Sequence, residues 1–379
     1  MKGDDEMSDS VENKRQIERL TRAVRMAGAL ASDIDIPDYS DRLTEECSNL
    51  LGAYRSFLFL VDEDSKDLFA AIFPPGKTIR IPSGTGIEGW VADTGEYVIT
   101  DSPQSDTRFD SRLEDEIDEK IENLMVVPVT GARGRTLAVL ESINKPGGFD
   151  SADFLMIRII LSQVAATLEN TRLYRDLKTT FQSLIQVMAA TIDARHPISC
   201  GHSNRVAKFA VGIAEEMGLP PGELEQIKIA SLLHDYGKVG VHDSILRKGG
   251  ELTDEEYRAV KEHVTITHNI VSKIHFTEEL SDVATIASCH HERWDGKGYP
   301  FGLAGEAIPL GSRVISVADV FDAITSSREY RKARSYKVAY EEIISGGGKQ
   351  FDPEVVEAFR RYYEKELEGS YPEEGSCGR

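Results

Sequence analysis

The sequence predicts a multidomain protein, in which a long helix joins an N-terminal α+β domain to an all-α helical bundle. Three observations support this fold class. At 379 residues the chain is too long for one ordinary hydrophobic core. Strand-like runs separated by Gly- and Asp-rich turns occupy the first half, whereas helical spacing prevails beyond residue 196. Between these patterns, residues 153–194 contain neither Gly nor Pro.

The N-terminal domain is expected over residues 36–152, after a leader and a helix in residues 1–35. The acidic start of the leader predicts disorder, and Pro37 and Asp38 are expected to end the helix that follows it. Helical spacing over residues 43–51 predicts another helix. Apolar runs predict an antiparallel sheet with strands over 56–61, 68–72, 97–99, 125–129 and 137–140.

Residues 153–195 predict a long connector helix. Its apolar residues recur at spacings of three and four, which is typical of a coiled coil. Asn170 and Thr171 interrupt this seam, so an amphipathic helix packed on its own domain is an equal alternative. The apolar positions are Leu161, Val164, Leu168, Leu173, Leu177, Phe181, Leu184 and Met188.

The composition is that of a soluble protein, with 40% hydrophobic and 28% charged residues. No apolar run reaches the ~20 residues of a membrane-spanning helix, and the acidic N-terminus does not resemble a signal peptide. A formal net charge of -20 argues against binding to the backbone of DNA or RNA. The four cysteines form no paired motif, which fits reduced thiols. We therefore expect a cytoplasmic protein without membrane insertion.

A group of histidines and acids carries the main functional prediction. All nine histidines lie between His196 and His291, and five of them fall on or beside apolar stripes of predicted helices. Inward polar groups are costly unless they are paired or bind a metal, and imidazoles with carboxylates suit iron, manganese or zinc. The four histidine-bearing helices are predicted over 202–213, 224–234, 257–271 and 283–291, and a fifth helix over 314–324 carries Asp319.

The motifs around these residues resemble those of the HD phosphohydrolase superfamily. His234 and Asp235 match its name-giving doublet, and residues 290–300 (HHERWDGKGYP) look like the hallmark of its HD-GYP subfamily. The resemblance covers residues 180–362. It implies an all-α domain, here 196–366 with a flexible tail at 367–379. The implied metal ligands are His202, His234, Asp235, His263, His290, His291 and Asp319.

The resemblance also implies the number of metal ions. Members of this family hold two or sometimes three divalent cations, and the carboxylate at Asp235 would bridge two of them. A third ion uses a glutamate one turn before the first histidine, and Ile198 stands at that position here. The sequence therefore predicts two ions, with iron or manganese favoured.

By the same resemblance the chain is a bacterial signalling phosphodiesterase, which opens cyclic di-GMP to linear pGpG and in some members onward to GMP. Asp235 and Lys238 would be catalytic, and Lys238 would also contact phosphate. Tyr299, in the Gly-Tyr-Pro loop, would contact the ligand or a protein partner. Arg328 and Arg331 would bind the substrate phosphate or guanine. The alternatives are a solvated lysine, a loop-anchoring tyrosine and a solvated basic helix end.

Residues 81–92 (IPSGTGIEGWVA), with Asn144, Lys145, Phe149 and Asp153 further on, resemble a GAF sensor domain over 38–174. This resemblance implies regulation by an unknown small molecule, and a parallel homodimer joined through the connector helix. Two other functions stay open. One is hydrolysis of a different cyclic dinucleotide, and the other is a catalytically silent receptor or signalling relay.

Overall fold

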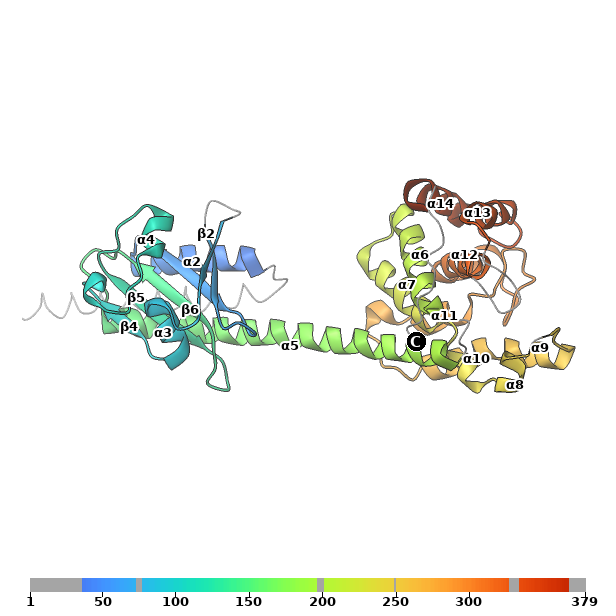
Figure 1. Ribbon diagram of the computed structural model, residues 1–379, viewed down its shortest axis with the longest axis horizontal. Coiled ribbons are helices and arrows are strands. Elements are labelled where there is room, and N and C mark those ends of the chain that lie inside the picture. The colour runs from blue at the N-terminus through green and yellow to red at the C-terminus, as the bar shows by residue number, and fades with distance from the viewer. Residues whose placement is uncertain (1–35, 73–76, 196–200, 249, 327–333, 368–379) are drawn as a thin grey trace, which may run out of the picture. The chain divides into compact units, whose positions relative to one another are not determined.

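The computed structural model describes residues 36–72, 77–195, 201–248, 250–326 and 334–367 (Figure 1). The chain divides into two compact units that meet in sequence between Leu177 and Lys178. The leader and helix predicted in residues 1–35, and nearly all of the tail predicted over 367–379, lie outside the described residues.

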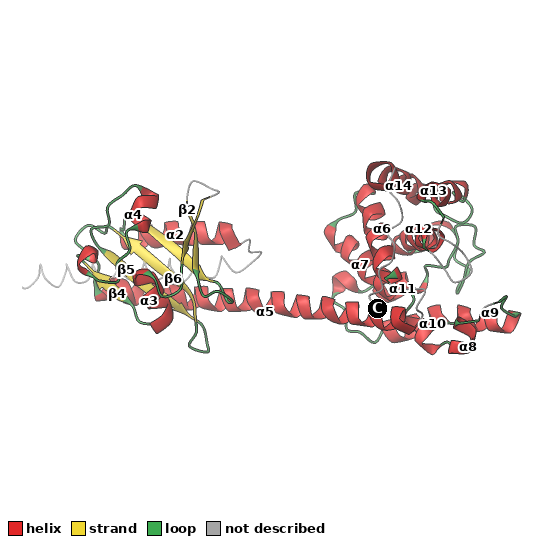
Figure 2. Cartoon of the chain, viewed as in Figure 1, coloured by secondary structure: helices red, strands yellow, loops and turns green. Residues whose placement is uncertain are grey.

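The first unit is a six-stranded antiparallel sheet with helices on both faces (Figure 2). The strand order is β3-β2-β1-β6-β5-β4. The helices α2 (Ile36–Leu51) and α5 (Ser151–Arg195) share one core with the sheet, and residues of α3 (Gly86–Thr94) and α4 (Arg112–Ile117) share a second core on its other face. The strands are β1 (Arg55–Val61), β2 (Leu68–Ile72), β3 (Lys77–Ile81), β4 (Val98–Thr100), β5 (Leu124–Thr130) and β6 (Thr136–Ile143).

The α+β fold class is confirmed, but two local predictions need correction. The sequence did not predict β3, because Lys77 and Arg80 interrupt its apolar pattern; as an edge strand it tolerates such charges. The helix predicted over 43–51 begins earlier, at Ile36. Pro37 lies in its first turn, where the missing N–H of proline has no intrahelical partner to lose, so this proline belongs to a helix start.

The connector α5 is one continuous helix of 45 residues, as predicted. Its first turns bury Leu161 and Val164 on the sheet of the first unit. Farther along, Phe181 packs on the core of the second unit. Among the described residues, α5 alone is long and apolar enough to span a membrane by length and composition, and 39% of its 18-residue apolar window is buried within the structure.

The second unit is a helical bundle, as predicted (Figure 2). Within it α6 packs against α7, α12 and α14, and α10 packs against α11. The principal helices are α6 (His202–Glu216), α7 (Pro221–Leu233), α8 (Asp243–Leu246), α9 (Asp254–Lys261), α10 (His263–Val271), α11 (Val283–Ser288), α12 (Leu310–Thr325), α13 (Tyr336–Ser345) and α14 (Pro353–Tyr362). Short turns of 3-10 or π type are η1 (Pro103–Ser105) in the first unit, and η3 (Tyr236–Gly240), η4 (Glu278–Leu280), η5 (Gly305–Ala307) and η6 (Tyr363–Leu367) in the second.

Two helices of this bundle differ from the sequence prediction. The helix expected over 257–271 consists of α9 and α10, which meet at Glu262. The helix expected over 283–291 ends at Ser288, so His290 and His291 follow it in a turn.

Candidate metal centre

The histidines and acids singled out from the sequence lie mainly at helix ends of the second unit. His202 is the first residue of α6, and His263 is the first residue of α10. His234 and Asp235 directly follow α7. His290 and His291 follow α11, and Asp319 lies within α12. The structure therefore brings all seven candidate ligands from five separate segments to one place.

Asp235 is at the centre of this group. Its Oδ2 lies 3.5 Å from Nε2 of His234 and 3.7 Å from Nε2 of His202. Its Oδ1 faces the opposite way, 3.4 Å from Nε2 of His263. Asp319 lies near both sides: its Oδ1 is 3.4 Å from Nε2 of His202 and 4.0 Å from Nε2 of His234, and its carboxylate also groups with His290. The two carboxylate oxygens of Asp235 thus face different histidine nitrogens, Oδ2 those of His202 and His234 and Oδ1 that of His263.

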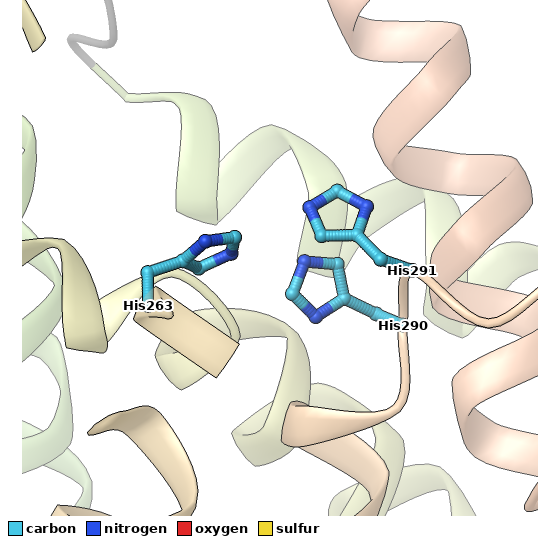
Figure 3. A group of neighbouring side chains, drawn as sticks. All are labelled: His263, His290 and His291. Carbon is cyan, nitrogen blue, oxygen red and sulfur yellow. The ribbon is translucent and has the colours of Figure 1, made fainter. Parts of the chain in front are cut away.

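A second set of donors is the histidine trio His263, His290 and His291, whose rings face a common space (Figure 3). The ring centroids of His290 and His291 are 4.0 Å apart, and those of His263 and His291 are 5.2 Å apart. One ligand atom from each member lies within 4.8 Å of the others. The same criterion groups His202 and His234 with Asp235.

Local hydrogen bonds fix the tautomer of three of these rings. In each, Nδ1 lies 2.6–2.7 Å from the backbone carbonyl oxygen three residues earlier. A carbonyl only accepts, so Nδ1 carries the hydrogen and Nε2 presents its lone pair to the site. All three Nε2 atoms are buried without a hydrogen-bond partner. The three rings are those of His234, His263 and His290, and such unpartnered buried nitrogens fit a metal ion.

The protonation states also suit a divalent cation. Burial and the neighbouring rings hold the pKa of His290 well below its usual range, and burial lowers the pKa of His291 to about 4. Burial opposes ionisation of Asp235, but Lys238 and the surrounding histidines outweigh it and keep the pKa of this acid well below its usual value. Neutral imidazoles and ionised carboxylates are the forms that bind iron, manganese or zinc.

His202 has a different environment from the other rings. Its Nδ1 donates to Oδ2 of Asp322 at 2.7 Å, and Oδ1 of Asp322 accepts from Nε of Arg205 at 2.6 Å. Burial opposes a charge on His202, but Asp319 and Asp322 outweigh it and raise its pKa to about 10. A cation between His202 and Asp319, whether a proton or a metal ion, is therefore strongly favoured.

Lys238 lies beside the central acid. Its ammonium group forms an ion pair with Oδ2 of Asp235. The family resemblance had implied a catalytic role for both residues. Gly237 allows η3, which carries Lys238, to lie against the start of α10, because a Cβ at this position would lie 1.8 Å from the carbonyl oxygen of His263. The Lys238 side chain is 29% exposed, so its ammonium remains accessible from solvent.

Tyr299 and its loop border the histidine trio. The centroid of the Tyr299 ring lies 4.8 Å from that of His291, and the ammonium nitrogen of Lys261 lies over the Tyr299 ring, 4.8 Å from its centroid. Glu292 holds the loop in place, because its buried carboxylate accepts the backbone N–H groups of the three residues 301–303 at 2.7–3.1 Å. Tyr299 is therefore at the edge of the site.

Sequence reasoning assigned no role to Asp322, Glu292 or Lys261, although Glu292 lies within the motif recognised over residues 290–300. Asp322 could have been found from its place one helical turn after Asp319, on the same face of α12. The predicted substrate-binding residues Arg328 and Arg331, and Ile198 at the position of the third-metal glutamate, lie outside the described residues.

The fold and these donors define a helical domain with a candidate metal centre, preceded by an α+β domain. Residues 33–169 match the family profile of the GAF domain, and residues 186–355 match that of the HD domain. The chain therefore consists of a GAF domain followed by an HD domain, as the sequence motifs indicated.

Curated relatives match about half of the chain. A cyclic di-GMP phosphodiesterase of Thermotoga maritima is 44% identical over 46% of this chain and 46% of its own length. A 3'3'-cGAMP-specific phosphodiesterase 2 of Vibrio cholerae is 36% identical over 56% of this chain and 41% of its own length. The matches thus span less than half of these relatives. Among solved structures, a cyclic GMP-AMP specific phosphodiesterase of V. cholerae shares 22% identity and a TM-score of 0.39 over 48% of each chain.

Proposed function

We propose that this protein is a phosphodiesterase that hydrolyses cyclic di-GMP to linear pGpG with a centre of two divalent cations, iron or manganese. The observation that carries the proposal is the set of three buried Nε2 atoms without partners, arranged around the two-sided carboxylate of Asp235. Relatives named as cyclic dinucleotide phosphodiesterases, at 36–44% identity over 46–56% of this chain, supply the substrate class.

The donors divide between two positions. His263, His290 and His291 would hold one ion together with Oδ1 of Asp235. The other ion would be held by His202, His234, Oδ2 of Asp235 and Asp319. Two cations at such positions supply a hydroxide nucleophile at neutral pH and neutralise the charge that develops on a phosphate.

Residues around the donors would bind and orient the dinucleotide. Lys238 places a positive charge beside Asp235, where a phosphate oxygen would approach, and proton donation to the departing 3′ oxygen is within its chemistry. Tyr299 offers an aromatic face next to His291 for a guanine base. Arg328 and Arg331 keep their predicted role as phosphate or guanine contacts.

The test measures metal content and turnover on one sample. Anaerobically purified protein would be analysed for metals and incubated with cyclic di-GMP and, separately, with 3'3'-cGAMP. We expect about two ions per chain and formation of pGpG. The His263→Ala variant should lose one ion and at least 100-fold in turnover. The matched control is His275→Ala, which removes an exposed histidine outside the site and should leave both values unchanged.

Two other outcomes would redirect the proposal. Preferential cleavage of 3'3'-cGAMP would assign the second dinucleotide as substrate, which the name of the V. cholerae relative makes a specific alternative. Binding of cyclic di-GMP by metal-replete protein without cleavage would make the chain a receptor and refute hydrolysis.

We further propose that the GAF domain regulates this centre in a parallel homodimer. Leu173, Leu177, Leu184 and Val187 of α5 are exposed, and their spacings of four, seven and three place them on one coiled-coil seam. Pairing with the same stripe of a second chain would bury them.

The last turn of α5 contacts two residues of the HD unit that directly follow residues of the site. Ser203 Oγ, next to His202, donates to Asp193 at 3.2 Å. Arg195 donates to the carbonyl oxygen of Val239, next to Lys238, at 2.6 Å. A rotation of the paired helices would therefore act on two residues of the site, which gives the proposed regulation a physical route.

A further inference from the structure

The side chain of Lys261 is held between two tyrosine rings at the border of the candidate metal centre. Tyr257 and Lys261 lie four residues apart on α9, and the ammonium nitrogen of Lys261 is 4.5 Å from the centroid of the Tyr257 ring. The same nitrogen is 4.8 Å from the centroid of the Tyr299 ring, which belongs to the Gly-Tyr-Pro loop. Both distances lie within the ~6 Å range of a cation–π contact. Two separate segments therefore fix the position of one ammonium group.

This ammonium group is connected to the metal centre through Tyr299 and through the chain itself. The Tyr299 ring lies 4.8 Å from that of His291. Burial raises the pKa of the Tyr299 hydroxyl above its usual value, and nearby negative charges, that of Asp235 among them, add to this rise. Lys261 is also the last residue of α9, two positions before His263. Lys261 thus borders the space in which a substrate would lie on the metal ions.

The charge of Lys261 is not neutralised by any acid in the part of the chain that the structure describes. Lys238, another ammonium group beside the centre, is already paired with Asp235. Aromatic rings stabilise a cation, but they offer no oxygen acceptors to the three N–H donors of an ammonium group. A half-buried ammonium group whose donors are not taken by a carboxylate is suited to bind an anion.

The proposed substrate brings a second anionic group that needs such a partner. A cyclic dinucleotide contains two phosphodiester groups, and each carries one negative charge. The metal ions of the proposed centre bind the phosphodiester that is cleaved. The other phosphodiester stays charged, and a chain with a formal net charge of -20 requires a local cation to hold it.

We propose that Lys261 is a specificity-determining residue of this site, which binds the phosphodiester that is not cleaved. The proposal rests on the phosphodiesterase function proposed above. The two tyrosine rings hold the flexible lysine stem before the substrate arrives, so less side-chain freedom is lost on binding. A ligand with a single phosphate gains nothing from Lys261, because its phosphate lies on the metal ions. Lys261 therefore selects cyclic dinucleotides over mononucleotides.

The test measures equilibrium binding to the metal-replete full chain. The probes are GMP and a phosphorothioate analogue of cyclic di-GMP, which is hydrolysed slowly. Lys261→Met keeps an apolar stem between the rings and removes the charge, so the Kd of the analogue should rise ~10–100-fold while that of GMP changes less than about twofold. Lys261→Arg keeps a cation over the rings and should restore most of the affinity. The matched control is Lys273→Met, at an exposed lysine outside the site, which should bind both probes like wild type.

The metal content of each variant separates recognition from structure. Loss of metal from Lys261→Met would show that Lys261 positions the neighbouring His263, and equal weakening of both probes would show a general charge effect. Either result would overturn the proposal, as would an analogue that binds Lys261→Met as tightly as wild type. The assay does not depend on turnover. Binding that depends on Lys261 without cleavage would refute hydrolysis alone, whereas cleavage with a Kd that does not depend on Lys261 would refute this inference alone.

Discussion

The Asp322→Asn substitution tests how the bundle orients His202. Asp322 is 1% exposed and accepts three charge-assisted hydrogen bonds, from Nδ1 of His202 at 2.7 Å and from two guanidinium nitrogens of Arg205 at 2.6 and 3.1 Å. Asparagine keeps the shape, but its amide nitrogen would face one of these donors and the negative charge is lost. Removing such a partner of a metal-bound histidine typically weakens metal affinity or activity by ~10–100-fold.

The assay is competition with a chelator, followed by elemental analysis and thermal unfolding. The Asp322→Asn protein should release metal at ~10–100-fold lower chelator concentration than wild type. Loss of a buried ion pair alone costs stability, so a matched control is needed. Asp352→Asn removes an equally buried acid that pairs with Arg313 at 2.6 Å and contacts no candidate ligand. If both variants hold metal as tightly as wild type, the argument about His202 fails.

Three further predictions concern other parts of the chain. Burial and the neighbouring carboxyl group of Glu88 raise the pKa of Glu141, on β6, in the folded state, so its contribution to stability is present below the ordinary glutamate value of 4.5 and is lost as the pH rises; the melting temperature of wild type should fall above pH 4.5 more than that of Glu141→Met, and parallel curves would contradict this. Leu184→Glu should convert the proposed dimer to monomer in light scattering, whereas Lys178→Glu, beside the seam, should not. Glu292→Gln removes the negative charge that accepts three backbone hydrogen bonds, each worth ~1.5–3 kcal/mol. The backbone amides of residues 301–303 should therefore exchange their hydrogens with solvent faster than in wild type, and unchanged protection would show that Glu292 does not hold the loop.

The fold class was accessible from the sequence because it rests on periodicity, whereas the ligand set came from the resemblance to the HD motifs, supported by histidines on or beside apolar stripes. His202 shares a stripe with Val206 and Phe209, and all three are buried. Helix ends were less accessible. Successive residues on a helix point ~100° apart, so a helix through His290 and His291 would separate their side chains. The chain avoids this by ending α11 at Ser288, where no Gly or Pro marks the boundary.

Long-range contacts were beyond sequence reasoning altogether. The predicted strand over 137–140 stopped short of Glu141, because a charged residue reads as the end of an apolar run. In the structure β6 continues to Ile143, and the acid is covered by α3, which lies far away in sequence. Whether a charged side chain is exposed or buried depends on the covering element, and periodicity carries no information about it.

The same distinction separates the ligands of the metal centre. The rings of His234, His263 and His290 are each oriented by a carbonyl oxygen three residues earlier, so their geometry is encoded within one turn. His202 instead depends on Asp322, which is 120 residues away. Its neighbour Ser203 is also bonded to Asp193 on α5. A shift of α5 would therefore disturb the orientation of His202 before that of the locally fixed rings. Of the two proposed ion positions, the one that includes His202 is the position that a signal through the connector would reach first.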